Sequence, residues 1–249
     1  ESKPFCFISV EYLKEKSIPF KDSVYASLDD LLTNQEKKDF EKLVGMNHSL
    51  AQTVKQCKAT ISYPPNGLPM LLYGPTGTGK SLIAKLTYEW ARNQGVISKD
   101  GQFVQVNCSE YANNPELLTA NLFGHVKGAF TGAEKDNEGL IALADNGVLF
   151  LDEVHELKAE CQEKLFLFMD QGIYHRVGDN EKWYKSNVRI VFATTENPDK
   201  VLLKTLMRRI PMTITIPSLE QRGTQERIEL LYNIFSQEEK RLDCQIKMS

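Results

Sequence analysis

A complete P-loop pattern is present at Gly74-Pro75-Thr76-Gly77-Thr78-Gly79-Lys80-Ser81. An apolar run precedes it at 68–73, and a helical pattern follows it at 82–91. In this setting the glycines let backbone N–H groups close around phosphate oxygens, and the helix N-terminus adds a favourable dipole. The pattern predicts that Lys80 reaches the β- and γ-phosphates of a nucleotide and that the Ser81 hydroxyl binds Mg²⁺.

A glycine-rich turn between a strand and a helix also occurs in dinucleotide-binding folds, which use three glycines in a fixed spacing. The third glycine of that fingerprint would fall on Leu82 in this chain. The spacing therefore favours a nucleotide-phosphate loop over a dinucleotide site.

Apolar runs and helical patterns alternate along most of the chain. Five runs predict strands, at 68–73, 102–106, 147–151, 188–193 and 212–216, and most of them are near-continuously apolar, as strands covered on both faces should be. Helical stretches separate them, and Asn114-Pro115 supplies a cap followed by proline at the first position of one helix. This alternation predicts an α/β fold of three layers, in which helices cover both faces of a five-stranded parallel sheet.

The pattern divides the chain into three parts. Residues 1–42 read as a separate linker segment with an apolar stretch at 5–10, and residues 43–221 carry the strand and helix alternation. From 222 to 249 we expect a helical subdomain that is incomplete at Ser249, with a helix over 224–241. Because the first residue is Glu1 and not methionine, we expect the chain to be a fragment.

Composition excludes some classes of function. With 30 basic and 33 acidic residues, the formal net charge is -3, so the chain has no global basic field for DNA or a membrane. The five cysteines lie far apart, which indicates reduced thiols in a cytoplasmic protein and argues against zinc or disulfides. We find neither a signal peptide nor an apolar run of membrane-spanning length.

An acidic pair, Asp152-Glu153, ends the apolar run at 147–151. Such a pair is often a solvated turn, but beside a P-loop it has a chemical role. Asp152 at the end of a strand can hold Mg²⁺ directly or through water, and Glu153 can orient and deprotonate an attacking water. The P-loop and the acidic pair together predict ATP hydrolysis.

The stretch around Phe130 places an apolar ring among glycines, alanines and charged residues. A phenylalanine in so flexible and polar a setting is a poor core residue, and a solvent-facing turn is the simpler interpretation. The alternative is that the ring is available to contact a partner.

With these motifs in place, the chain closely resembles the central AAA+ domain of bacterial enhancer-binding proteins, which activate sigma-54 RNA polymerase. The resemblance runs from about Leu43 to the end, and it implies an AAA+ P-loop fold followed by a small helical lid. Its most specific element is a hexapeptide in a loop that interrupts a helix, and it implies that these residues contact sigma-54: Gly128, Ala129, Phe130, Thr131, Gly132 and Ala133. The hairpin around 172–183 resembles a second loop that supports the first.

The resemblance also assigns roles around the nucleotide. Asn107 matches an asparagine that restrains the catalytic glutamate, and Thr194 matches a sensor threonine. The family's next residue, an asparagine, is replaced by Thr195 in this chain, which reaches less far. Adenine is expected near Leu43, Val44 and Gly45. The remaining nucleotide contacts implied by the resemblance are Gly74, Pro75, Thr76, Gly77, Thr78, Gly79, Lys80, Ser81 and Leu82.

The arginines that complete a neighbouring active site depart from the family pattern. The family usually has two, and Arg208 matches the second, whereas Leu202 occupies the position of the first. Arg209 or Lys204 can substitute, although a lysine does not reproduce the bidentate fork of an arginine.

Several short stretches resemble the levan-operon regulator branch of the family, among them Asn113-Asn114-Pro115 and Arg208-Arg209-Ile210-Pro211. This branch implies an N-terminal DNA-binding helix-turn-helix and, beyond the motor, sugar phosphotransferase-system regulatory domains. Residues 1–42 supply no convincing helix-turn-helix, so we expect both regulatory ends to have been trimmed away. We therefore expect a sigma-54 activator core that forms a ring, a hexamer in this family, with ATP between subunits. Two alternatives stay open: a different AAA+ remodelling ATPase, and a nucleotide-switched assembly module with little turnover.

Overall fold

The structure is a computed structural model of the chain and describes residues 39–242. Our expectations for the linker up to residue 38 and for the last residues, 243–249, lie outside the described residues. All the elements named below belong to one compact unit, which begins at Phe40.

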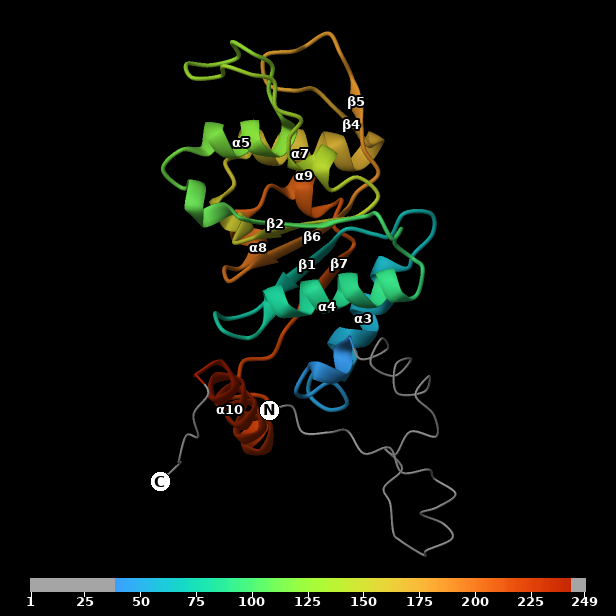
Figure 1. Ribbon diagram of the computed structural model, residues 1–249, viewed down its shortest axis with the longest axis vertical. Coiled ribbons are helices and arrows are strands. Elements are labelled where there is room, and N and C mark those ends of the chain that lie inside the picture. Colours follow the sequence, from blue (N-terminus) through green and yellow to red (C-terminus); the bar gives the residue numbers. More distant parts are fainter. Residues whose placement is uncertain (1–38, 243–249) are drawn as a thin grey trace, which may run out of the picture. The chain divides into compact units, whose positions relative to one another are not determined.

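Five parallel strands form the central sheet, in the order β2-β3-β6-β1-β7 (Figure 1). The strands are β1 (Met70–Tyr73), β2 (Phe103–Asn107), β3 (Val148–Asp152), β6 (Arg189–Thr194) and β7 (Met212–Thr215). Each lies within two residues of its predicted bounds. The three inner strands β1, β3 and β6 are buried along nearly their whole length, as expected for strands covered on both faces, whereas the edge strands β2 and β7 also contain exposed polar residues. The predicted five-stranded parallel sheet is confirmed.

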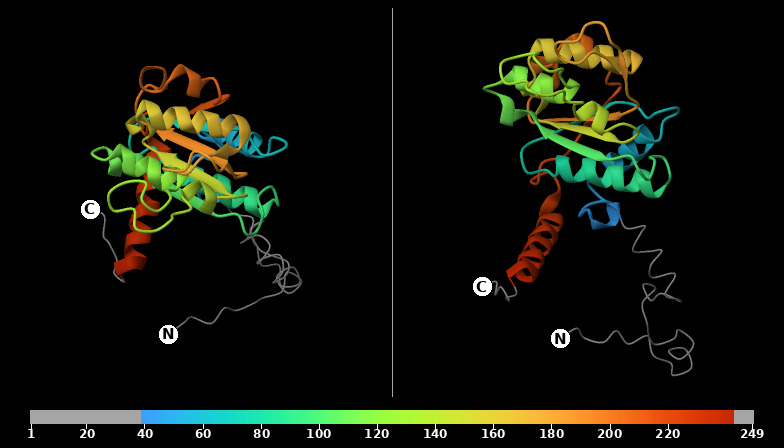
Figure 2. Two further views of the ribbon diagram at one scale, coloured as in Figure 1. Left: turned by 90° about the horizontal axis from the view of Figure 1, so that it is seen from above. Right: turned by 45° about the horizontal axis from the view of Figure 1, so that its top comes forward.

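Helices cover both faces of this sheet, and the views in Figure 2 show them on opposite sides. One face carries α3 (Ala51–Ile61) and α4 (Lys80–Asn93), and the other carries α5 (Pro115–Phe123), α7 (Ala159–Gln171) and α9 (Lys204–Met207). The shorter elements are η1 (Phe40–Lys42), η2 (Cys108–Tyr111), α6 (Leu140–Leu143), η3 (Val154–Glu156), α8 (Pro198–Val201), β4 (Ile173–Tyr174) and β5 (Tyr184–Lys185).

Strand β3 shows how the sheet divides the core into two clusters. Val148 and Phe150 pack with α3 and α4, whereas Leu149 and Leu151 pack with α5, α7 and α9. All four are fully buried, as expected when successive side chains point to opposite faces of a sheet that is covered on both sides. This arrangement is the predicted three-layer α/β fold.

The start of α5 follows from local sequence. The Asn114 side chain accepts a hydrogen bond from the Leu117 backbone N–H at 3.2 Å, and Pro115 occupies the first helical turn. This satisfies one of the backbone donors that a helix N-terminus leaves free, while proline has no N–H to satisfy. The predicted cap is confirmed.

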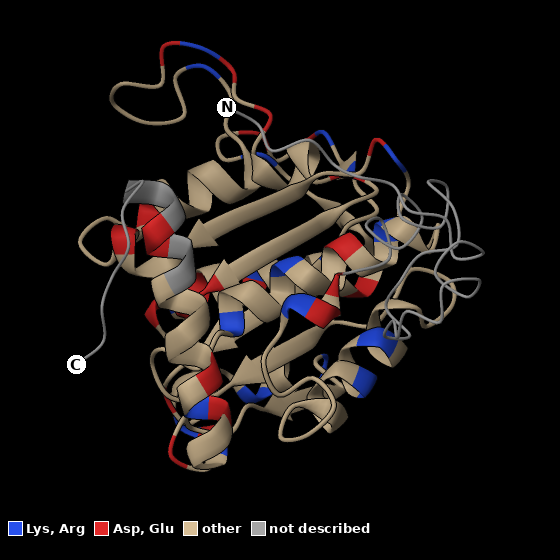
Figure 3. Ribbon diagram, turned by 60° about the horizontal axis from the view of Figure 1, so that its bottom comes forward, with Lys and Arg blue, Asp and Glu red and all other residues tan. Residues whose placement is uncertain are grey.

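The last described element is α10 (Gly223–Leu242), at the place where a helix was predicted over 224–241. Its apolar residues Ile228 and Leu231 are 42% and 52% exposed. Basic and acidic residues are interspersed over the helices and loops (Figure 3), in keeping with the small net charge. In the described part of the chain, no helix has both the length and the apolar composition that a bilayer crossing requires.

Strand order places four predicted site segments at one edge of the sheet. β6 pairs with both β1 and β3, with Tyr73 beside Thr194, and β2 pairs with β3, with Asn107 beside Asp152. In a parallel sheet the carboxyl ends share an edge, and ligands bind in the crevice outside it. The P-loop, the acidic pair, Thr194 and Asn107 therefore meet there.

Replacement of Phe192 tests the packing of the central strand. Phe192 is fully buried on β6, so Phe192→Ala is expected to lower the free energy of unfolding by about 3–5 kcal/mol in urea denaturation. Leu143→Ala, at a side chain that is 51% exposed, is the control and should change the free energy by less than about 0.5 kcal/mol. Equal effects in the two variants would contradict the described core.

Candidate functional site

The P-loop joins β1 to α4 through two glycines in the left-handed region. Gly77 and Gly79 have φ of 77° and 93°, and a Cβ built on either would meet nothing within 4 Å. The backbone conformation, and not lack of space, therefore requires glycine at both positions. The Lys80 ammonium donates hydrogen bonds to the carbonyl oxygens of Gly74 at 2.8 Å and Pro75 at 3.1 Å, so it lies within the loop.

Lys80 is a buried cation with acidic neighbours. Its side chain is 6% exposed, and burial lowers its pKa below the ordinary value for lysine. The carboxylates of Glu153 and Asp152 oppose this shift because they stabilise the charged form. The acidic pair thus supports a positive charge at the place where phosphate oxygens are expected.

Ser81 and Asp152 come from distant parts of the sequence and meet at this edge. The Ser81 hydroxyl donates a hydrogen bond to Asp152 Oδ2 at 2.7 Å. Mg²⁺ prefers oxygen ligands and is usually held by one or two protein side chains together with phosphates and water. These two side chains fit such a site. Within residues 39–242 no group of three or more His, Cys, Asp or Glu side chains is placed to hold a metal ion.

Glu153 follows β3 with an unusual backbone. Its φ and ψ are 51° and 50°, in the left-handed region that costs a residue with a Cβ about 1–2 kcal/mol. Strain of this kind tends to occur at functional sites. The carboxylate is 24% exposed, and its Oε2 accepts a hydrogen bond from the Thr195 hydroxyl at 3.0 Å. Thr195 therefore still reaches the glutamate, in spite of its short side chain.

Asn107 lies beside Asp152 in the sheet but does not bond to Glu153. Its Oδ1 accepts hydrogen bonds from the backbone N–H and the hydroxyl of Ser109, at 3.1 and 2.8 Å, and so caps η2. The structure thus brings Thr195 onto the glutamate and leaves Asn107 engaged with Ser109.

Thr194 is fully buried at the end of β6. Its hydroxyl lies 3.2 Å from Nδ1 of His155 and accepts a hydrogen bond from the Glu196 backbone N–H. The expected sensor threonine thus contacts a side chain that follows the acidic pair by only two residues.

The three candidate cations near α9 differ in their surroundings. Arg209 forms a two-pronged ion pair with Asp170, with both distances 2.5 Å, and lies over the Phe166 ring. Arg208, by contrast, is exposed and its side chain makes no hydrogen bond or ion pair within residues 39–242. Lys204 is exposed at the first residue of α9. Leu202, at the position where the resemblance implies an arginine, is 5% exposed in the core.

The segment expected at adenine is attached to the start of α10. Gly45 has a φ of 84°, and a Cβ there would come within 2.5 Å of the Glu226 carboxylate. Glu226 accepts hydrogen bonds from the backbone N–H and the hydroxyl of Ser49, at 3.1 and 2.5 Å. Val44 is 9% exposed, and a cavity of about 240 Å³ lined by Leu43 and Gly45 opens beside it.

Arg222, the residue before α10, makes a second connection, to the P-loop itself. The guanidinium is 8% exposed and donates to the carbonyl oxygens of Thr78 and Pro217. Burial lowers its pKa, and Glu226 opposes the shift. The phosphate loop, the adenine segment and α10 therefore share one polar cluster.

The hexapeptide lies in the loop between α5 and α6, at the end of the molecule where β4 and β5 also lie (Figure 1). Two hydrogen bonds close it, from Gly128 N–H to the Ala133 carbonyl at 2.8 Å and from Ala133 N–H to the Phe130 carbonyl at 3.0 Å. Phe130 is 39% exposed, and its ring packs edge-to-face against the His125 ring, with the two ring centroids 4.9 Å apart. The expectation that this ring is not a core residue is confirmed.

The hairpin around 172–183 contacts the root of this loop. Val177 accepts a hydrogen bond from Val126 N–H at 3.1 Å and donates one to the Gly124 carbonyl at 2.9 Å. Gly178 lies against Ala129, since a Cβ on Gly178 would come within 2.7 Å of the Ala129 side chain. The two loops are therefore bonded and packed together.

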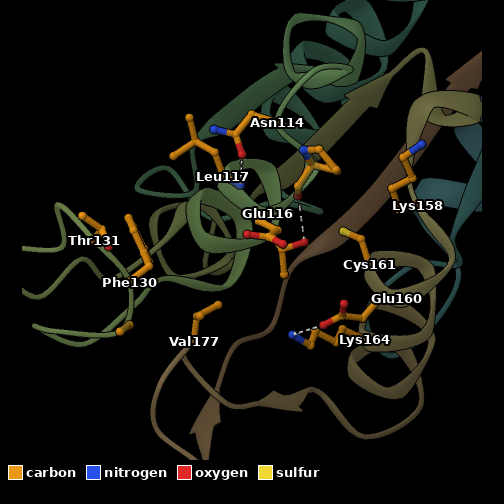
Figure 4. Close-up of a pocket in the computed structure, with 13 residues that line it drawn as sticks. Asn114, Glu116, Leu117, Phe130, Thr131, Lys158, Glu160, Cys161, Lys164 and Val177 are labelled. Atoms are coloured by element: carbon orange, nitrogen blue, oxygen red, sulfur yellow. Dashed lines mark hydrogen bonds and ion pairs between the residues drawn. The ribbon is translucent and has the colours of Figure 1, made fainter.

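A cavity of about 910 Å³ opens between the hexapeptide and the first turns of α5 and α7 (Figure 4). Phe130 and Thr131 lie on one side of it, and Leu117 and Lys164 come from the two helices. The exposed ring thus borders a hollow that combines apolar and charged walls.

Four residues of this site were not predicted from the sequence: Ser49, His155, Arg222 and Glu226. His155 stands only two residues after Glu153 in the sequence, and that position is the one local signal that could have drawn attention to it. The other three bond across the chain, between 49 and 226 and between 78 and 222, and no local pattern predicts such pairs.

Residues 43–214 match the family model described as the sigma-54 interaction domain. The chain belongs to this family. The chain is similar to the transcriptional regulatory protein LevR of Bacillus subtilis (strain 168), with 50% identity over 202 residues, 81% of this chain and 22% of LevR. Similarity to the transcriptional regulatory protein DagR of Salmonella typhimurium (strain 14028s) covers 241 residues at 39% identity, 94% of this chain and 25% of DagR.

The chain therefore spans a quarter or less of these two regulators, and its similarity to them supports the levan-operon regulator branch. The crystal structure of NtrX from Brucella abortus in complex with ADP superimposes with a TM-score of 0.65 at 24% identity, over 90% of this chain and 49% of that chain. The crystal structure of NtrX from Brucella abortus in complex with ATP superimposes with a TM-score of 0.63 at 22% identity, over 89% of this chain and 49% of that chain. These likenesses show that the chain and NtrX share the α/β fold described above.

Removal of the buried ammonium tests the phosphate site. Lys80→Ala is expected to abolish ATP binding in isothermal titration calorimetry, because the variant lacks the cation inside the loop. Lys85→Ala, at an exposed position of the same helix, is the matched control and should bind as the parent does. Unchanged ATP affinity in Lys80→Ala would show that the nucleotide binds elsewhere.

Proposed function

We propose that this chain is the ATP-hydrolysing core of a sigma-54-dependent transcription activator. The observation that carries the proposal is the group formed by Lys80, the bonded pair Ser81 and Asp152, and Glu153 at one sheet edge. This is the set of side chains that phosphoryl transfer to water requires: a cation for the phosphates, oxygen donors for Mg²⁺ and a carboxylate for the water.

Each residue has a separate task in the proposed reaction. Lys80 binds the β- and γ-phosphates, and Glu153 orients the attacking water and accepts its proton. Ser81 and Asp152 hold Mg²⁺, which when bound neutralises charge on the phosphate oxygens. The backbone N–H groups of the P-loop complete the phosphate site.

A neighbouring subunit supplies Arg208 in the proposed assembly, which is a homo-oligomeric ring, a hexamer by the family resemblance. An arginine from a neighbour typically contributes a factor on the order of 10³–10⁵ in rate. The exposure of Arg208 and the freedom of its side chain from bonds within 39–242 support this role. The ion pair of Arg209 with Asp170 argues against Arg209 as a second finger.

Phe130 and Thr131 are the proposed contacts with sigma-54 in the RNA polymerase holoenzyme. Family membership supports this assignment, as does the exposed ring beside a large hollow. A short route links the two sites, because Asn107 caps η2 and η2 leads into α5, which carries the loop. We propose that the hydrolysis state moves the loop along this route and so remodels the closed promoter complex.

The similarity to LevR and DagR supports a role as part of a larger cytoplasmic regulator. By the branch resemblance, sugar phosphotransferase-system domains regulate this motor, and a domain outside residues 1–249 binds DNA.

A second candidate function is a nucleotide-switched assembly module with little turnover. The buried Leu202 and the engaged Arg209 favour it, because both reduce the cations available to a shared site. Steady-state ATP hydrolysis separates the two: turnover per subunit should rise with protein concentration only when shared sites form.

Glu153→Gln tests the hydrolytic role of the carboxylate. Glutamine keeps the shape and the hydrogen-bonding capacity of the glutamate side chain, but it cannot accept the proton. The variant should therefore bind ATP, and its rate of ATP turnover should fall at least about a hundredfold. Glu163→Gln, an exposed glutamate on α7, should retain parental turnover as the control. Parental turnover in Glu153→Gln would assign the base to another group.

Thr131→Ala tests the partner contact. Full-length protein is mixed with purified sigma-54 and ADP plus a metal fluoride that mimics the transferring phosphoryl group. The parent is expected to form a stable complex in size-exclusion chromatography, and Thr131→Ala is expected to lose it while it keeps parental ATP turnover. Lys135→Ala, exposed in the same loop, is the matched control. A stable complex of Thr131→Ala would exclude this residue as the contact.

A further inference from the structure

His155 occupies a position between the predicted base and the predicted sensor. Its Nδ1 lies 3.2 Å from the Thr194 hydroxyl and 3.3 Å from Oε2 of Glu153. The His155 side chain is 19% exposed, and the Glu153 side chain is 24% exposed. The imidazole is thus a partly buried polar group whose inner nitrogen faces both functional side chains.

One nitrogen therefore serves two partners. Nδ1 carries at most one hydrogen, which can be donated to the threonine hydroxyl or to the glutamate carboxylate. In the structure the hydrogen-bond geometry is formed with Thr194, while the carboxylate is at ion-pair distance. A small rotation of either side chain exchanges the partner, so the state of Thr194 and the orientation of Glu153 are linked through the ring.

The two oxygens of Glu153 have different surroundings. Oε2 accepts the hydrogen bond from Thr195 and lies beside His155, whereas Oε1 accepts no hydrogen bond from residues 39–242. A carboxylate held through one oxygen leaves the other available to a water molecule. Such an orientation suits a general base, which must lie within hydrogen-bond reach of the proton that it accepts.

The backbone of the turn after β3 places His155 beside Glu153. Glu153 is in the left-handed region, and η3, which contains His155, follows it directly. The short turn therefore presents the imidazole to the carboxylate that precedes it by two residues. On its outer side, Nε2 of His155 lies 3.6 Å from Glu156 Oε1, so the ring is held between two acidic side chains.

We propose that His155 is a positioning residue for ATP hydrolysis, which links the sensor Thr194 to the base Glu153 and orients that carboxylate together with Thr195. The inference rests on the proposed function, since it assigns a role in the reaction of the same site. Its content is separate, because neither the P-loop pattern nor the acidic pair predicts a histidine in this place.

Two substitutions of His155 distinguish a positioning role from simple packing. His155→Phe keeps an aromatic ring but removes both nitrogens, whereas His155→Asn keeps a donor on the δ atom at a similar distance from the backbone. Steady-state ATP hydrolysis by the full-length protein gives kcat and KM for both. We expect His155→Phe to lower kcat by about tenfold or more with KM changed less than about twofold, because misplacement of a base affects the chemical step. His155→Asn is expected to recover most of that loss.

A double substitution tests whether His155 and Thr195 act on the same carboxylate, which a purely structural role of His155 does not predict. If Thr195 and His155 act on the same carboxylate oxygen, the loss of kcat in Thr195→Val combined with His155→Phe should be smaller than the product of the two separate losses. Independent effects, parental kcat in His155→Phe, or equal losses in the Phe and Asn variants would each overturn the inference.

The variant Glu153→Gln distinguishes failure of the role of His155 from failure of the proposed ATPase function. Inactive Glu153→Gln together with parental kcat in His155→Phe would leave the proposed function standing and remove only the role of His155. Parental turnover in Glu153→Gln, or a parent without turnover, would remove the proposed function and with it this inference.

Discussion

The hydrogen bond from Ser81 to Asp152 is the contact on which the site depends. It joins the first residues of α4 to the end of β3, two elements that are distant in sequence, at a separation of 2.7 Å. Both residues are in place because β6 lies between β1 and β3 and all three strands run in parallel, which puts their carboxyl ends at one edge. Every other site residue is placed relative to this edge, including Lys80 inside the loop.

Patterns of local sequence were sufficient for the fold and for the phosphate site. The inner strands β1, β3 and β6 are buried on both faces and read as apolar runs, and the edge strands β2 and β7 still contain enough apolar residues to be placed. The P-loop has a fixed spacing. Side-chain partners were not predictable in this way. Asn107 was expected to restrain Glu153, yet it bonds to Ser109 two residues away, because a short polar side chain at a strand end readily caps the turn that follows. Ser49 and Glu226 meet only after the chain has folded.

Two glycines, Gly124 and Gly139, determine how closely the two ends of the loop that carries the hexapeptide approach each other. A Cβ on Gly139 would collide with the backbone of residues 122–124, and one on Gly124 would collide with the carbonyl oxygens of Asn137 and Glu138. The two ends of this loop, at residues 122–124 and 137–139, therefore approach each other more closely than a side chain on either glycine would permit. The hairpin packs against the same root through Val177 and Gly178, so a shift at the root would move the exposed Phe130.

The leucine at position 202, where the resemblance implies an arginine, lies in the core and not on the surface. Leu202 is 5% exposed in the cluster that includes Leu165 and Leu206, and an unpaired guanidinium there would have to leave water without a partner. Restoring an arginine at this position would therefore disturb the packing of α9. Arg209 already has a partner in Asp170, whose pKa it lowers by hydrogen bonding. If two copies of this chain formed a shared ATP site, Arg208 would therefore be the arginine available to complete it. ATP turnover would then depend closely on how the neighbouring subunits align.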